Sequence, residues 1–198
     1  MTRPALVALM LVLNLSAMDA VADEPKVGVS EWYPAKVGTE WHYRSSKGPM
    51  INKITKHEKV GETMCAHIET RLNDRVVANE DIAIGKSTVE RHAFSGFRPE
   101  PPVVLAKFPL KEGDEWLIDS KIGGEEMKGK AVVEKESITV KAGKFETFKV
   151  RMEVESNGMT IRSESWYAKG VGMVKQYMDL AGTELTIELE KVVLPPSK

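Results

Sequence analysis

Apolar and polar residues alternate along much of the chain downstream of its N-terminal segment. The segment 148–155, FKVRMEVE, places four apolar side chains on one face and four charged side chains on the other. Segments 64–72 and 185–190 alternate in a similar way. A period of two residues is that of a β-strand with one buried and one solvated face. The pattern therefore predicts a succession of antiparallel strands.

Turn-forming pairs separate these runs at short intervals, and Asn157-Gly158 is the pair that a two-residue type I′ hairpin favours. No window of the mature chain shows a helical period. We predict a mainly β fold, an antiparallel curved sheet, barrel or half-barrel of about eleven strands with little helix. Such a sheet can be filled by its own side chains, enclose a cavity or dock its apolar face on a partner. The sequence leaves these three solutions open.

One stretch of the sequence occurs twice. YPAKVGTEW, residues 33–41, returns as FPLKEGDEW, residues 108–116, at an offset of 75 residues. Proline sets φ for a turn, glycine permits a positive φ and tryptophan favours a strand, so each copy predicts a turn that leads into a strand. Downstream segments also correspond. We interpret the chain as two tandem repeats, one spanning about residues 32–97 and the other about residues 107–193.

The first residues of the chain have a different character. Arg3 precedes an apolar run, and the triplet AVA, which ends at Ala22, precedes Asp23. This pattern predicts a signal peptide, residues 1–22, with cleavage after Ala22. The apolar run is shorter than the roughly 20 residues that cross a bilayer, which disfavours an N-terminal anchor. We expect an exported protein, periplasmic or secreted, with one β domain over residues 23–198 and no transmembrane anchor.

Charge and cysteine content limit the classes of partner and the covalent links that the sequence predicts. The 28 Lys and Arg residues nearly balance the 29 Asp and Glu residues, and the formal net charge is −1. The two signs are interleaved, so no basic stripe predicts nucleic-acid binding and no charged tail predicts binding to a membrane surface. Cys65 is the only cysteine, which rules out an internal disulfide. No cysteine follows the apolar run, as the acylated cysteine of a lipoprotein would.

Four segments together carry a resemblance to a known family: YPAKVGTEWHYR, FPLKEGDEW, VKAGKFETFKVR and WYAKGVGMVKQ. The chain resembles an uncharacterised family of exported bacterial β-proteins that repeat a Pro-x-x-x-Gly-x-x-Trp motif and carry a Trp-Tyr-Ala-x-Gly-Val-Gly segment. More remotely, that family is similar to the half-barrels of periplasmic lipoprotein carriers, which hold acyl chains against a concave apolar face. This sequence departs from those carriers because it lacks clear helices. The resemblance implies an exported β fold and supplies no catalytic residues.

Large aromatic side chains and methionines are the candidates for contact with a ligand. The four tryptophans are expected to be core anchors, since two of them occupy equivalent positions in the repeated motif. The same residues would form the wall of an apolar cavity if the sheet encloses one. The predicted wall consists of Trp41, Trp116, Phe148, Met152 and Trp166.

No metal site, cofactor or catalytic residue is predicted. In the segment MCAH, residues 64–67, Cys65 and His67 point to one face of a strand and Met64 to the other, so it offers two soft ligands rather than three. The histidines lack metal-ligand spacing, and no serine lies in a nucleophile elbow. A hydrolase would require at least two of a small set to converge: Cys65, His67, Glu69, His42 and His92.

These observations favour a non-catalytic extracytoplasmic binding or carrier protein for an apolar or lipid-like ligand. One alternative is an envelope interaction or assembly module that buries its apolar face in a protein partner. The other alternative is a hydrolase whose site assembles from several strands. The expected partner is an apolar small molecule or lipid, or an envelope protein, and not a nucleic acid.

Overall fold

The computed structural model describes residues 27–28 and 30–196, so the predicted signal peptide lies outside the described residues. Their secondary structure is twelve strands in one antiparallel sheet, without a helix, rather than the predicted number of about eleven. No segment of this part of the chain forms a helix that could cross a bilayer. The strands are β1 (Glu40–Ser45), β2 (Gly48–Val60), β3 (Thr63–Leu72), β4 (Arg75–Ile84), β5 (Thr88–Phe94), β6 (Val103–Lys107), β7 (Glu115–Ile122), β8 (Glu125–Val140), β9 (Gly143–Ser156), β10 (Met159–Ala168), β11 (Gly172–Leu180) and β12 (Thr183–Val193).

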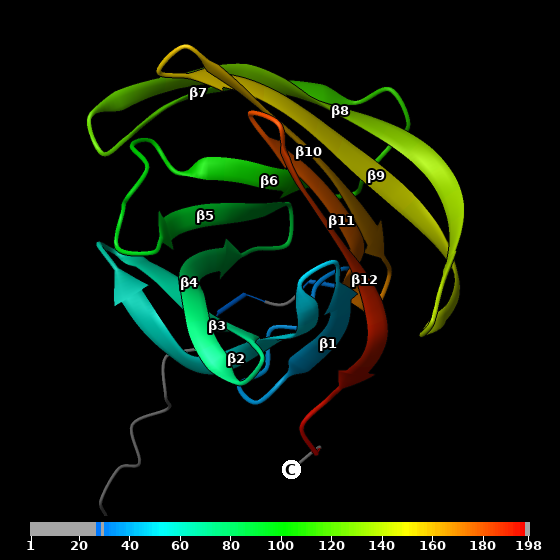
Figure 1. Ribbon diagram of the computed structural model, residues 1–198. Coiled ribbons are helices and arrows are strands. Elements are labelled where there is room, and N and C mark those ends of the chain that lie inside the picture. The colour runs from blue at the N-terminus through cyan, green and yellow to red at the C-terminus, as the bar shows by residue number, and fades with distance from the viewer. Residues whose placement is uncertain (1–26, 29, 197–198) are drawn as a thin grey trace, which may run out of the picture.

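Each half of the chain forms a meander of six strands. The order across the sheet is β6-β5-β4-β3-β2-β1-β12-β11-β10-β9-β8-β7, so the halves join where β1 pairs with β12 (Figure 1). Strand β6 lies between the two predicted repeats. It is a short run, VVLAK, without the alternation that predicts the other strands. Its presence explains why a reading based on alternation counts fewer strands.

The two edges of the sheet approach each other and nearly close a barrel. Between β6 and β7 the backbone contact is the bridge between Glu100 and Lys121, with N–H···O distances of 2.8 and 2.9 Å. Side chains of β7 add to this seam. Trp116 Nε1 donates to the carbonyl of Val104 at 3.1 Å, and Ser120 Oγ donates to the carbonyl of Pro101. We call this junction the seam.

The repeated motif forms the same turn in both places. In the first copy the N–H of Gly38 donates to the carbonyl of Ile54 at 2.8 Å, and in the second Gly113 donates to Val133 at 2.9 Å. In both copies the next residue donates to the carbonyl of the lysine two positions before the glycine, at 3.0 and 3.1 Å. Each turn leads into the first strand of a meander, β1 or β7. Tandem duplication of the whole unit remains a prediction.

The two ends of the barrel differ. At one end, the closed end, the segment before β1 lies across the opening. Its Trp32 stacks on Phe108 with ring centroids 5.8 Å apart, and Tyr33 packs on Trp41 at 5.3 Å. The other end, the hairpin rim, carries six turns, because every second connection of the meander returns there. The Asn157-Gly158 hairpin lies there with positive φ at both residues, 51° and 72°, as a type I′ turn requires.

Candidate functional site

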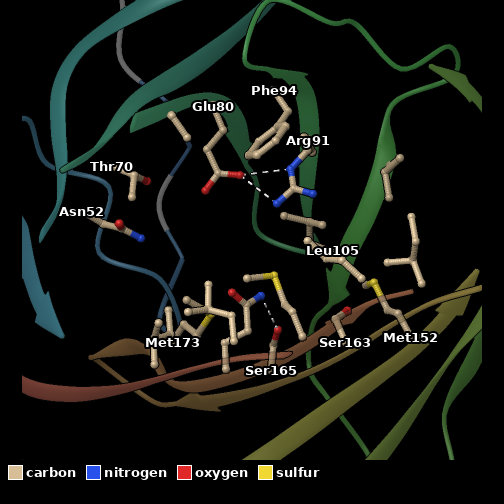
Figure 2. Close-up of a pocket in the computed structure, with 18 of the residues that line it drawn as sticks. Asn52, Thr70, Glu80, Arg91, Phe94, Leu105, Met152, Ser163, Ser165 and Met173 are labelled. Carbon is tan, nitrogen blue, oxygen red and sulfur yellow. Dashed lines mark hydrogen bonds and ion pairs between the residues drawn. The ribbon is translucent and has the colours of Figure 1, made fainter. Parts of the chain in front are cut away.

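A cavity of about 540 Å³ occupies the barrel interior. This volume falls within the range of about 300 to 1,000 Å³ of small-molecule sites. Apolar side chains make up most of the wall, among them five methionines, whose flexible thioethers adapt to varied apolar shapes. Figure 2 shows side chains from opposite walls pointing into this space. The five are Met50, Met127, Met152, Met173 and Met178.

The cavity opens at the hairpin rim. Val77, Phe94 and Leu180 line the cavity, yet their exposed fractions are 55, 40 and 48%. Further large apolar side chains are exposed around the same end. Exposed apolar groups that gather in one place are typical of binding surfaces, whereas single ones are ordinary. We define the apolar rim as Val76, Val77, Phe94, Phe97, Met159 and Leu180.

A row of polar side chains crosses one wall of this apolar space. Asn52 on β2 is the cross-strand partner of Thr70 on β3, and Glu80 and Arg91 continue the row on β4 and β5. We call these four residues the polar belt, and Figure 2 labels all of them. The side-chain oxygen of Asn52 is buried and has no hydrogen-bond partner among the described residues.

Glu80 and Arg91, the two charged residues of the polar belt, form an ion pair. Arg91 donates to the same carboxylate oxygen, Glu80 Oε2, from Nε at 3.0 Å and from Nη2 at 2.8 Å. The guanidinium also lies 5.1 Å from the ring centroid of Phe94, within cation–π range. The two charges cancel, so the belt presents hydrogen-bonding groups without net charge.

The opposite wall adds uncharged polar groups from β10 and β11. Gln176 donates to Ser165 Oγ at 3.1 Å. Burial raises the pKa of Tyr167 to about 12, and the negative charge of Glu80 acts in the same direction. Burial likewise holds the pKa of Tyr33 well above its ordinary value of 10.0. Both phenols that line the cavity are therefore protonated at neutral pH.

Sequence reasoning missed Glu80 and Arg91, although a signal for Glu80 exists. Along β4, Ile82 and Ile84 are buried and share a face with Glu80. A charged residue in the apolar register of a strand indicates a buried polar site that needs a partner. The partner lies on another strand, 11 residues along the chain.

Of the five residues predicted as cavity wall, Met152 lines the cavity. Trp41 lies behind Tyr33 and is 1% exposed, with its Nε1 donating to the carbonyl of Val171 at 2.7 Å. Trp116 is buried at the seam. Neither tryptophan belongs to the lining, and their positions fit the expected role of core anchors.

Phe148 and Trp166 also lie outside the lining. Phe148 meets Trp32 edge-on at the closed end, with centroids 5.6 Å apart. Trp166 faces away from the cavity, and the Nζ atoms of Lys149 and Lys175 lie 5.7 and 5.4 Å from the centroid of its ring. A role of these residues in ligand contact remains a prediction, and the cavity supplies no direct contact for four of the five.

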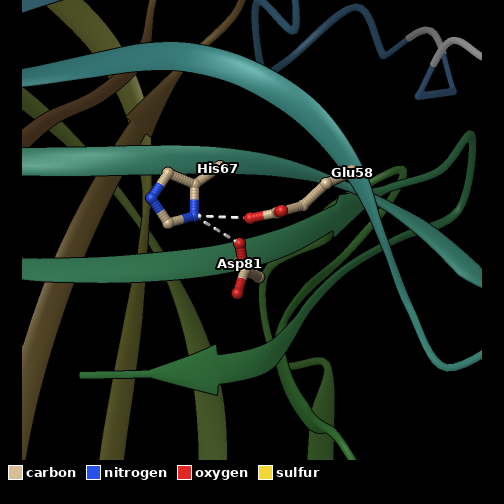
Figure 3. Close-up of side chains that lie close together, drawn as sticks. All are labelled: Glu58, His67 and Asp81. Carbon is tan, nitrogen blue, oxygen red and sulfur yellow. Dashed lines mark hydrogen bonds and ion pairs between the residues drawn. The ribbon is translucent and has the colours of Figure 1, made fainter. Parts of the chain in front are cut away.

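A second cluster lies apart from the cavity. His67 Nδ1 is 2.7 Å from Asp81 Oδ1 and 3.0 Å from Glu58 Oε1, as Figure 3 shows. The three ligand atoms lie within 4.8 Å of one another. Because carboxylates accept hydrogen bonds, an Nδ1–H that donates to both of them accounts for these distances without a metal. We therefore assign no metal role to this cluster.

The small set of residues considered for a hydrolase is not joined into one site. His67 bonds to Asp81, His42 lies 3.0 Å from Glu40, and within the described residues no hydrogen bond joins two members of the set. Cys65 is fully buried, and burial followed by the charge of Asp81 raises its thiol pKa to about 12. An activated thiol has a lowered pKa, so this geometry does not favour nucleophilic attack by Cys65.

Comparison with solved structures shows the fold. An exported protein with a YmcC-like fold from Bacteroides fragilis, so named provisionally, aligns with a TM-score of 0.54 and 12% identity over 84% of this chain and 100% of its own. A provisionally named lipoprotein from Parabacteroides distasonis aligns with a TM-score of 0.53 and 14% identity over 83% of this chain and 100% of its own. No protein of curated function matches in sequence. A sequence model of the family described as DUF3108-like matches residues 119–178, which run from β7 into β11.

Proposed function

We propose that the chain is a non-catalytic extracytoplasmic protein that binds or carries an apolar or lipid-like ligand in its barrel. The observation that carries the proposal is the cavity of about 540 Å³, which is walled mainly by apolar side chains and opens at the apolar rim. An interior that its own side chains filled completely would leave no such space. The methionines allow the wall to adjust to the ligand.

Location outside the cytoplasm has two supports. The sequence predicts a signal peptide, residues 1–22. The two structural neighbours carry names that describe an exported protein and a lipoprotein. We also propose that the chain is a relative of the DUF3108-like family beyond the matched segment and that its meanders arose by tandem duplication. The identically bonded turns before β1 and β7 support the duplication.

An uncharged apolar dye tests whether the cavity binds apolar molecules. N-phenylnaphthylamine should fluoresce strongly with the folded protein, because it leaves water for the barrel interior. Ser163→Trp, which fills the cavity from β10, should abolish the signal. Leu117→Trp adds the same ring on the outside of β7, where Leu117 is 84% exposed, and should preserve it. No fluorescence with the native protein, or full fluorescence with Ser163→Trp, would contradict the proposal.

The apolar rim favours a second candidate, the envelope interaction module. Its exposed side chains would become buried if a protein docked over the mouth of the barrel. Val76→Ser with Phe97→Ser, two rim residues outside the cavity lining, should then abolish self-association measured by sedimentation while dye binding in the cavity persists. Association that is unchanged in this variant would remove the second candidate. No observation in the described residues favours a hydrolase.

A further inference from the structure

On two facing walls of the cavity, apolar side chains lie nearer the mouth than the polar side chains do. Along β4 the wall passes from Val77, near the turn, to Glu80, and along β5 it passes from Phe94 to Arg91. In each strand the charged residue lies three positions farther from the hairpin rim. Three residues of strand span roughly 10 Å. The ion pair therefore lies well inside the barrel.

The facing wall repeats this order. On β10, Ile161 lies nearer the rim than Ser163, and on β11 Met178 lies nearer the rim than Gln176. On these two walls apolar side chains lie toward the mouth and polar side chains form a band farther in, with Ile82 and Met173 beyond that band; Lys47, in the β1–β2 turn, adds one charged side chain at the mouth. A ligand that matches both zones has its polar end inside and its apolar end at the mouth.

The hydrogen-bonding needs of the deep zone define that polar end. Both nitrogen contacts of Arg91 end on Glu80 Oε2, which leaves Glu80 Oε1 and Arg91 Nη1 outside the pair. Asn52 contributes a buried oxygen without a partner. Two acceptors therefore lie on the same wall as one donor group. A matching ligand group must donate hydrogen bonds as well as accept them.

Charge excludes most ionised head groups. The ion pair is already balanced, so a carboxylate at the polar belt would place a third, uncompensated charge there and turn its oxygens toward other acceptors. The remaining charged residue of the lining, Lys47, is exposed in the β1–β2 turn at the rim. An ammonium group would meet the guanidinium of Arg91. A hydroxyl or amide head both donates and accepts, and it carries no charge.

We infer that the barrel binds a single-chain amphiphile with an uncharged hydroxyl- or amide-bearing head, inserted head first; this inference rests on the proposed function. The head lies at the polar belt, and the apolar chain lies along the methionine-rich wall toward the apolar rim. Chains longer than the cavity extend past the rim rather than folding inside it.

The native protein tests the head group without any substitution. Displacement of N-phenylnaphthylamine should show monodecanoylglycerol binding roughly tenfold more tightly than decanoate or decyltrimethylammonium, which have the same chain length but charged heads. Decanoate binding as tightly as the glyceride would overturn the inference and leave the proposed function standing. Failure of the dye and of all three amphiphiles would instead overturn the proposed function.

Bromine position tests the direction of insertion. Bromine quenches tryptophan at short range, and Trp41 lies behind Tyr33, which lines the cavity toward the closed end. A glyceride brominated beside its carbonyl should quench more strongly than one brominated at the far end of its chain. The reverse order would show that the chain enters first and would overturn head-first insertion.

Glu80→Gln tests the belt directly. The substitution retains the side-chain shape but leaves Arg91 without its anion, so decanoate should bind at least roughly tenfold more tightly than to the native protein and exceed the glyceride. Glu155→Gln removes an equal charge from an exposed site on β9 and should leave the native preference unchanged. An unchanged preference in a folded Glu80→Gln protein would contradict the inference. If that variant does not fold, the head-group and bromine measurements decide.

Discussion

At the scale of single residues, burial sets the chemistry of the thiol and the phenols more strongly than their neighbours in sequence do. Cys65 lies in a strand beside histidine and methionine, a composition that suggests reactivity, yet its side chain is fully buried. The tyrosines at the closed end are buried in the same way. For all of them the neutral form is favoured, because a low-dielectric surrounding penalises the charged form.

Cys65 should not react with a thiol reagent in the folded protein. Burial and the carboxylates of Asp81 and Glu58 raise its pKa to about 12, and only the thiolate form of the cysteine attacks the disulfide of the reagent. Ellman's reagent should therefore label the native protein slowly even at pH 9, and label it at once in strong denaturant. Rapid labelling under native conditions would show that the thiol is accessible and ionised.

The tyrosines should ionise only in strongly alkaline solution. Burial raises the pKa of Tyr33 and Tyr43 well above 10.0 and that of Tyr167 to about 12, and a hydrogen bond to Glu184 raises that of Tyr177. A pKa that is higher in the folded state than the unfolded value of about 10 stabilises the fold fully below pH 10. This stabilisation is lost as the pH rises through the folded pKa.

The measurement is phenolate absorbance against pH, followed together with the melting temperature. Little phenolate should form near pH 10 in the native protein, and the melting temperature should fall steeply above that pH. The unfolded protein in denaturant is the reference and should titrate near pH 10. Native titration at the same pH as the denatured reference would refute the burial of these side chains.

At the scale of elements, the fold depends on two equivalent turns that each deliver a tryptophan to the core. Gly38 and Gly113 adopt positive φ, 91° and 84°, which a residue with a side chain rarely adopts. Each glycine then donates to a carbonyl on the adjoining strand, which fixes how the first strand of the meander begins. The repeated sequence is therefore explained by a repeated local structure.

Trp41→Ala and Trp116→Ala should each lower the free energy of unfolding by about 3 to 5 kcal/mol, as the loss of a large buried aromatic does. Both rings are buried, and both indole N–H groups donate to backbone carbonyls. Urea unfolding measures the change. Leu117→Ala, next to Trp116 but exposed on the outside, is the matched control and should stay within about 0.5 kcal/mol of the native protein. Near-native midpoints for both tryptophan variants would contradict the core assignment.

At the scale of the whole molecule, the weakest join is the seam between β6 and β7. Every other neighbouring pair of strands is hydrogen-bonded along a ladder, whereas the described contact here is one backbone bridge with two side-chain bonds. Edge strands with unpaired backbone groups open at lower free energy than strands bonded on both sides. A barrel built this way has a built-in place to widen around a ligand.

Hydrogen exchange should reveal the seam. Amides of β6 and β7 should exchange faster than those of β8 and β9, whose long ladder pairs fourteen positions between Met127 and Ser156 at one end and Val140 and Gly143 at the other. Mass spectrometry of peptic peptides from native protein provides the comparison. Equal protection of β7 and β9 would show that the seam is closed as firmly as the rest of the sheet.

The residues around the cavity show which positions can be predicted from the sequence and which cannot. Met152 could be placed in the apolar register of its strand, and it lines the cavity. Trp166 is predicted as wall because it is large and apolar, but it alternates with Ser165 and Tyr167, which line the cavity, so its ring lies on the outer face beside two lysines. The bulge at this position lies on the neighbouring strand, where Val174 of β11 has no partner on β10. A second bulge lies on β5, where His92 has no partner on β4, since Asp81 pairs with Ala93 and Ile82 with Arg91. Alternation alone does not predict either irregularity.

The sequence by itself determined what depends on local order: the strands from their two-residue period, the hairpins from their asparagines and glycines, and the twin turns from the repeated motif. Tertiary structure decided which strands meet, and hence that the sheet curls until β6 approaches β7 around an apolar cavity. It also decided that Glu80 and Arg91 form one ion pair in the wall of the cavity. These features depend on contacts between strands that are distant along the chain, and the side-chain period of a single strand contains no information about its partner.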